Sequence, residues 1–181
     1  HATWVLYTAH KFGWGPVDVG LSLTLVGVGA AIVQGGLARK LIPALGPGSI
    51  GEKRALLFGL AMAVLAYIGY GAATHGWMIY AIIAIASLGG ISQPAAQALI
   101  TKTVHGDEQG AVQGTLTGLQ GVANIFAPIV GSQVFAYFIS DRAPAHIAGA
   151  SYYLSALLAL GGLLVATRAL KNVHTHAAPA A

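Results

Sequence analysis

The stretch that decides the fold is EQGAVQGTLTGLQGVANIFAPIVG, residues 108–131. It is too apolar for a soluble loop and too polar for a helix that faces lipid on every side. Four uncharged polar side chains recur at i, i+4, i+7 and i+11, and therefore share one face of an α-helix: Gln113, Thr117, Gln120 and Asn124. An unpaired amide in hydrocarbon costs several kcal/mol. This polar stripe must therefore face either partner helices or a water-filled cavity.

The composition indicates an integral membrane protein. The chain has 181 residues, of which 56% are hydrophobic and 8% charged, and its mean hydropathy is +0.71. Soluble domains carry roughly 25% charged residues, so this chain cannot build a water-soluble surface. Its net charge of +4 fits the cytoplasmic Lys/Arg excess of membrane proteins, and we do not expect it to bind nucleic acid.

Apolar runs predict five complete spans, each at least long enough to cross a bilayer: residues 18–38, 55–73, 77–100, 108–139 and 145–169. Residues 2–8 have the character of the last turns of a further helix whose beginning is absent, so we expect the chain to be a piece of a longer protein. Turn-rich connectors are predicted at residues 10–17 and 39–54. Residues 1–172 then form one transmembrane bundle, and residues 173–181 form a cytoplasmic tail.

The basic residues predict the orientation of this multi-pass bundle. If the spans alternate, Lys11 and Arg142 lie on one side, and all other Lys and Arg residues lie on the opposite side: Arg39, Lys40, Lys53, Arg54, Lys102, Arg168 and Lys171. The positive-inside rule makes the richer side cytoplasmic, and the C-terminus lies on that side.

The distribution of charge limits the chemistry. Every Asp, Glu, Lys and Arg falls in a connector or at the end of a span, whereas a proton relay needs an ionisable side chain inside the membrane. The chain has no cysteine and none of the usual hydrolase, metalloprotease or P-loop motifs. We expect no enzyme activity, no cofactor and no metal site.

Uncharged polar side chains are therefore the candidates for substrate binding. They lie on the third and fourth complete spans: Ser87, Gln93, Gln97, Gln120 and Asn124. Either they hydrogen-bond to neighbouring helices, or they line a cavity and offer donors and acceptors to a substrate. The stripe alone favours neither. Pro94 can also bend the third span.

Four segments carry a resemblance to a known family. They are TWVLYTAHKFGWGPVDVGLSL (3–23), GLARKLIPALG with GEKRALLFGL (36–60), GWMIYAIIAIASLGGISQPAAQALIT (76–101) and EQGAVQGTLTGLQGVANIFAPIVG (108–131). The chain resembles the C-terminal half of a major facilitator superfamily transporter of the drug:H+ antiporter group, and is most similar to tetracycline efflux proteins.

The resemblance implies a fold of two six-helix bundles around a central cavity. This chain would supply a truncated helix seven and all of helices eight to twelve, and the N-terminal six-helix half is its missing partner. Ser87 and Gln97 would lie near the substrate path, and Gln120 and Asn124 at the cavity edge or against the other half. The implied partners are a small-molecule drug, protons and the lipid bilayer.

Three features depart from the family pattern. The sequence PGSIG (47–51) is inserted in the loop between family helices eight and nine, and Arg39 stands where the gating-loop motif has an Asp. Ala30 and Ala63 stand where some tetracycline exporters carry a His and an Asp. The coupling groups are therefore expected in the missing half.

The leading hypothesis is a proton-coupled exporter of tetracycline-like drugs in a bacterial inner membrane, working by alternating access. A sugar or metabolite carrier of the same superfamily and a truncated, non-transporting bundle are the alternatives.

Overall fold

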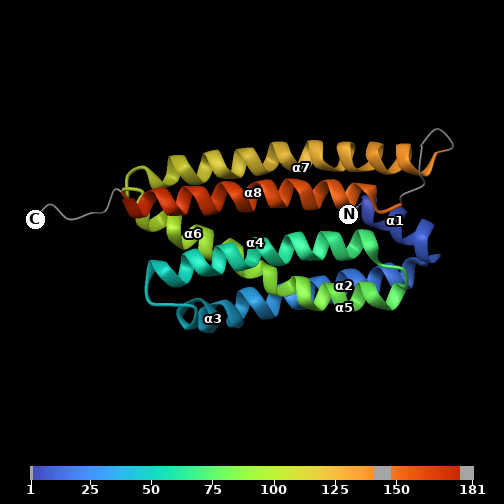
Figure 1. Cartoon of the computed structure of the whole chain (residues 1–181), viewed down its shortest axis with the longest axis horizontal. Helices are drawn as coiled ribbons and strands as arrows, with labels where there is room; N and C mark the ends of the chain where they lie inside the picture. Colours follow the sequence, from blue (N-terminus) through green and yellow to red (C-terminus); the bar gives the residue numbers. More distant parts are fainter. Residues whose placement is uncertain (1, 141–147, 176–181) are drawn as a thin grey trace, which may run out of the picture.

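The computed structural model describes residues 2–140 and 148–175, and its regular elements over that part of the chain are all helical (Figure 1). Five helical segments there are long and apolar enough to cross a membrane: Pro16–Ala44, Ser49–Ala72, Gly76–Lys102, Gln109–Ile139 and Ala150–Lys171. They match the five predicted spans one by one, although residues 145–147 lie outside the described residues. The predicted all-α membrane fold is confirmed.

The first connector is shorter than predicted because helix α1 (Ala2–Phe12) continues through its first residues. The helix stops at Gly13, whose φ of 66° lies in the left-handed region that favours glycine. Helix α2 (Pro16–Ile32) then starts with proline in its first turn, where the missing N–H costs nothing. The N–H of Gly15 donates to Asp18 Oδ2 at 3.2 Å, so the Asp18 side chain in the first turn bonds back to the residue that precedes the helix.

The basic connector predicted at residues 39–54 is wrong in extent. After α2 the helix continues through a π-helical segment, η1 (Val33–Leu37), into α3 (Ala38–Ala44). Helix α4 (Ser49–Ala72) starts directly after a short turn. The turn is placed by Gly46 and Gly48, with φ of 150° and 54°. The Lys, Arg and Glu residues on either side are good helix formers, and they prolong both helices.

The third span contains an interruption close to Pro94. It consists of α5 (Gly76–Ser87), the 3-10 segment η2 (Leu88–Ile91) and α6 (Ser92–Thr103). Pro94 has no N–H to donate to the carbonyl of Gly90, four residues earlier. The irregularity expected at the proline is therefore found in the turn that precedes it.

The last two spans are single helices, α7 (Gln109–Ile139) and α8 (Ala150–Thr175). Helix α7 passes through Pro128 without a break in its helical assignment. Helix α8 includes residues 173–175, which were predicted to belong to the tail; the remainder of that tail, residues 176–181, lies outside the described residues.

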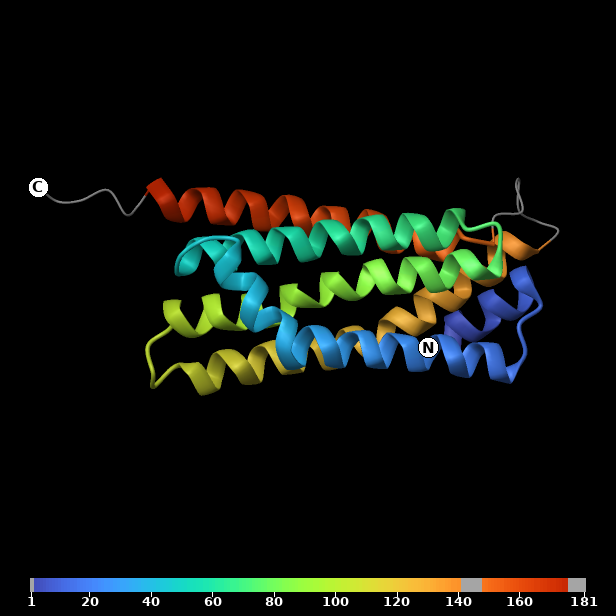
Figure 2. The same ribbon diagram turned by 90° about the horizontal axis from the view of Figure 1, so that it is seen from below.

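Helices α2 and α8 lie at opposite edges of the bundle in the view of Figure 2. Figure 2 shows α8 at one edge, then α4, then α5 with α6, and then α2 together with the first half of α7. Helices α4 and α8 pack against each other more extensively than any other pair of described elements. Helix α7 packs on α1 and α8, and its middle runs along the outside of the bundle.

The two ends of the bundle differ in charge. Helix α3, the start of α4 and the ends of α6 and α8 lie at one end in Figure 1, which we call the basic end because seven basic residues lie on these elements: Arg39, Lys40, Lys53, Arg54, Lys102, Arg168 and Lys171. Lys11 lies at the opposite end, and Arg142 is outside the described residues. The predicted segregation of basic residues is confirmed for the described part of the chain.

Candidate functional site

Two irregular helix segments face each other near the middle of the bundle. The π segment η1 in the second half of the first complete span packs against the 3-10 segment η2 of the third. A methyl group built on Gly90 would lie 3.7 Å from a Val33 side-chain carbon. Isolated π turns often mark functional positions, because they interrupt the regular ladder of hydrogen bonds.

Glycines allow the neighbouring helices to approach this interruption. A Cβ added to Gly29 of α2 would lie 2.1 Å from Ser87 Oγ, and one added to Gly59 of α4 would lie 2.7 Å from the Gly89 carbonyl oxygen. Both distances are far below van der Waals contact, so α2 lies close to the end of α5, and α4 lies close to η2. Gly29 thus allows α2 to pack closely on α5, as small residues commonly do between membrane helices.

Ser87 lies at the end of α5 and is half-buried. Its hydroxyl donates to the carbonyl of Ile83 at 2.8 Å, which leaves its lone pairs available to another donor. It borders two hollows of about 160 and 220 Å³. The smaller hollow is lined by mainly apolar residues: Val26, Ala30, Tyr70, Ile83, Ala86, Ser87 and Gly90.

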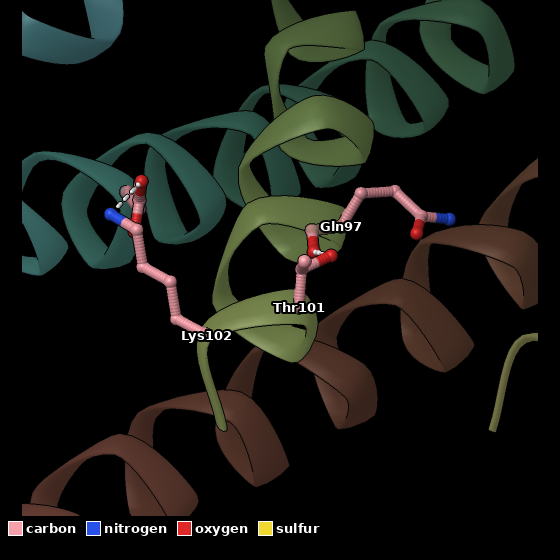
Figure 3. A network of polar contacts seen from close by, with 4 residues as sticks. Gln97, Thr101 and Lys102 are labelled. Carbon is pink, nitrogen blue, oxygen red and sulfur yellow. Dashed lines mark hydrogen bonds and ion pairs between the residues drawn. The ribbon is translucent and has the colours of Figure 1, made fainter. Parts of the chain in front are cut away.

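Gln97 joins α6 to α7 near the basic end. Gln113 Nε2 donates to Gln97 Oε1 at 2.5 Å, and Thr101 Oγ1 donates to the backbone carbonyl of Gln97 at 2.8 Å. Figure 3 shows the Gln97 and Lys102 side chains on opposite sides of α6, with Lys102 directed towards α4. Gln113 therefore makes an interhelical contact, and the amide nitrogen of Gln97 remains available as a donor.

Lys102 forms an ion pair with the buried carboxylate of Glu52. Its Nζ lies 2.6 Å from Glu52 Oε1, and the Glu52 side chain is 10% exposed. Glu52 Oε2 is buried without a hydrogen-bond partner among the described residues. The sequence placed Glu52 in a connector, whereas the structure places it in the first turn of α4. An ion pair thus fixes α4 to α6 on one side, while the glutamines fix α6 to α7 on the other.

The other three predicted site residues are exposed: Gln93 on α6, and Gln120 and Asn124 on α7. Along α7 every residue from position 117 to position 130 is exposed, including Leu119 at 69% and Phe126 at 59%. No hydrogen bond joins any two of the five predicted residues within the described part of the chain.

The sequence did not single out an aromatic hollow at the end opposite the basic one. It has a volume of about 300 Å³ and is lined by residues of α1, α2, α4 and α8: Thr3, Trp4, Leu23, Val26, Tyr67, Tyr70 and Tyr152. The rings of Trp4 and Tyr70 meet edge to face at 5.3 Å, and Trp4 Nε1 donates to Ser22 Oγ at 3.0 Å.

The side chain of Lys11 links α1 to the end of α4 at the same end of the bundle. Lys11 Nζ donates to the Tyr7 hydroxyl at 3.1 Å and to the Gly71 carbonyl at 3.0 Å. Burial lowers the pKa of Lys11, because desolvation disfavours its charged form.

The family model and the similar proteins point to the same family. The family described as Major Facilitator Superfamily matches residues 2–180. The chain is 35% identical to the class C tetracycline resistance protein of Escherichia coli over 162 residues, which cover 88% of this chain and 39% of the relative. It is 38% identical to the class G tetracycline resistance protein of Vibrio anguillarum over 128 residues, which cover 71% of this chain and 31% of the relative.

A relative outside bacteria is also similar. The chain is 30% identical to the Hippocampus abundant transcript 1 protein of Homo sapiens over 138 residues, which cover 76% of this chain and 27% of that protein. The chain thus spans about two fifths or less of the curated relatives it matches. No solved structure matches it.

Proposed function

The chain belongs to the major facilitator superfamily, and we propose that it forms the second half of an exporter that moves tetracycline-like drugs out of the cell in exchange for protons. Membership of this family supports a transport role and not an enzymatic one. The similarity to two tetracycline resistance proteins supports the drug class. The proposed location is a bacterial inner membrane, with the basic end and the C-terminus in the cytoplasm.

The observation that carries this proposal is the exposed polar stripe of α7. Gln120 and Asn124 are exposed near the middle of a 31-residue apolar helix, and an amide in contact with hydrocarbon would be costly. A partner outside the described chain therefore covers them. In the proposed transporter this partner is the other six-helix half, or the water and drug in the cavity between the halves.

We assign the substrate path to residues on both sides of this cavity. Ser87 borders the hollow between α2 and α5, and Gln93 and Gln97 continue the same span towards the basic end. The walls around Ser87 are mostly apolar, which suits a ring system with a few polar substituents better than a sugar. A few hydroxyl and amide groups then orient the drug.

Alternating access requires helices that change shape, and η1 and η2 are suited to this role. Their hydrogen-bond ladders are already interrupted, so a small rotation at these segments costs less than breaking a regular helix. The proton-binding groups belong to the other half in this proposal, because the described Asp and Glu residues lie at helix ends or in turns.

Export by the full-length gene product tests the proposal. Everted membrane vesicles that hold the protein are energised, and tetracycline is added while the internal pH and drug content are recorded. We expect drug uptake that a protonophore abolishes, together with proton release in step with uptake. Vesicles from cells with an empty vector are the control. Equal drug accumulation in both preparations would disprove drug export, and uptake that persists with the protonophore would disprove proton exchange.

A further inference from the structure

A hollow of about 350 Å³ lies between α4 and α8 at the basic end. It is formed by the first turns of α4 and the last turns of α8, two helices at the edge of the bundle away from α2 (Figure 2). Its lining combines three cations with apolar side chains and one hydroxyl: Ile50, Lys53, Arg54, Leu57, Thr167, Leu170 and Lys171. Neither the transport path nor the contact with the other half accounts for this site.

The charge of the hollow is strongly positive. Arg54 Nη1 donates to the Leu45 carbonyl at 2.8 Å, which positions the guanidinium and leaves further N–H donors on the same group. Glu52, the acidic residue in the same turn of α4, is committed to Lys102 of α6. Helix α4 also starts at Ser49, and the partial positive charge of a helix N-terminus adds to the field of the cations.

The hollow continues into an apolar surface. On α8, towards the middle of the span, Leu164 and Val165 are 52% and 68% exposed, and Leu65 of α4 is 58% exposed. Such side chains at membrane depth contact hydrocarbon chains. A ligand that fits both parts has an anionic head in the basic hollow and long apolar tails along α4 and α8.

We propose that this hollow binds an anionic phospholipid of the leaflet that faces the basic end. The phosphate is held by Lys53, Arg54 and Lys171, and the acyl chains run along the outer faces of α4 and α8. Basic pockets between transmembrane helices on the cytoplasmic side are suited to such head groups. A free phosphate would satisfy the cations but leave Ile50, Leu57 and Leu170 without apolar contact.

Lipid titration of the intact purified transporter tests the proposal. The protein is delipidated in detergent and titrated with phosphatidylglycerol or with phosphatidylcholine of the same acyl chains, and bound lipid is counted by native mass spectrometry. We expect phosphatidylglycerol to bind more tightly than phosphatidylcholine. The double substitution K53A and K171A should weaken phosphatidylglycerol binding by roughly thirtyfold, from about 1 kcal/mol per cation.

The matched control is R39A with K40A, which removes two positive charges from the same end but outside the hollow. We expect less than a twofold effect from it. The variant K53R with K171R keeps the charge and should bind normally, which separates loss of the site from loss of folding. Equal binding of both lipids, or equal weakening by the two alanine pairs, would overturn the proposal. Displacement of phosphatidylglycerol by millimolar inorganic phosphate would overturn it in favour of a soluble anion.

Discussion

Gln113 of α7 donates a hydrogen bond to Gln97 of α6, with 2.5 Å between Nε2 and Oε1. Further along α7, every residue from position 117 to position 130 is exposed, and these residues include both polar and apolar side chains. This hydrogen bond, with the contact of Gln109 Nε2 on the Thr101 carbonyl at 3.2 Å, fixes the basic end of α7.

We expect Gln113→Ala to destabilise the intact transporter by about 0.6 kcal/mol, the average for polar contacts between membrane helices. A double-substitution cycle with Gln97→Ala measures the coupling between the two amides through thermal unfolding in detergent. Thr115→Ala is the control, because within the described chain the Thr115 hydroxyl bonds only to the Ala111 carbonyl of its own helix. Additive effects of the two substitutions would show that the hydrogen bond does not stabilise the protein.

The ion pair between Lys102 and Glu52 predicts an asymmetric response. Lys102→Ala leaves a buried carboxylate without its cation, whereas Glu52→Gln removes the charge that needs one. Because Lys102 is 54% exposed, water screens part of the effect, and we expect about 1–2 kcal/mol of destabilisation for Lys102→Ala.

Restoring neutrality provides the check on that prediction. Glu52→Gln added to Lys102→Ala should recover part of the lost thermal stability, and Lys40→Ala at an exposed position should change little. If Lys102→Ala is no more destabilising than Lys40→Ala, the pair does not fix α4 to α6.

The contact between Gly29 and Ser87 predicts a clash that a second substitution relieves. A Cβ on Gly29 would lie 2.1 Å from Ser87 Oγ, so Gly29→Ala should destabilise the bundle by about 1–3 kcal/mol through overpacking. Adding Ser87→Gly should restore most of the stability. The control is Gly27→Ala, since among the described residues no atom outside the adjoining backbone of α2 lies within 4 Å of the added group. Equal unfolding temperatures for the two alanine variants would contradict the close approach of α2 and α5.

Hydropathy was sufficient to predict the spans. Charged residues are costly in lipid, and in a chain with 8% charged residues their positions mark where the spans end. Hydropathy could not predict that Glu52 is buried, since that depends on how α4 meets Lys102 of α6. The π segment at Val33–Leu37 also has no local signal beyond its two glycines. It occurs where α2 meets the broken third span, a contact between residues more than fifty positions apart.

The candidate site was predictable only as residue types on helix faces. Periodicity placed Gln113 and Asn124 on one stripe, but it could not show that the first bonds to α6 while the second is exposed. The aromatic hollow was missed for a related reason. Trp4, Tyr70 and Tyr152 come from three helices. Taken one helix at a time, an aromatic residue near a helix end predicts only a position at the membrane interface.

Asn124 distinguishes the roles proposed for the stripe, since it is exposed in this chain and covered in the proposed transporter. We expect Asn124→Leu to stabilise the isolated chain, because it removes an unpaired amide from an apolar surface, and to reduce drug export by the intact transporter by roughly three- to tenfold.

Gln133→Leu is the matched control: Gln133 is an exposed amide on the same helix, about half a turn round from Asn124 at 100° per residue. Initial rates of tetracycline uptake into everted vesicles, corrected for the amount of protein, give the comparison. A reduced rate for Asn124→Leu with a normal rate for Gln133→Leu locates the requirement on the stripe. If the Asn124→Leu transporter is fully active, Asn124 neither contacts the drug nor seals the boundary with the other half.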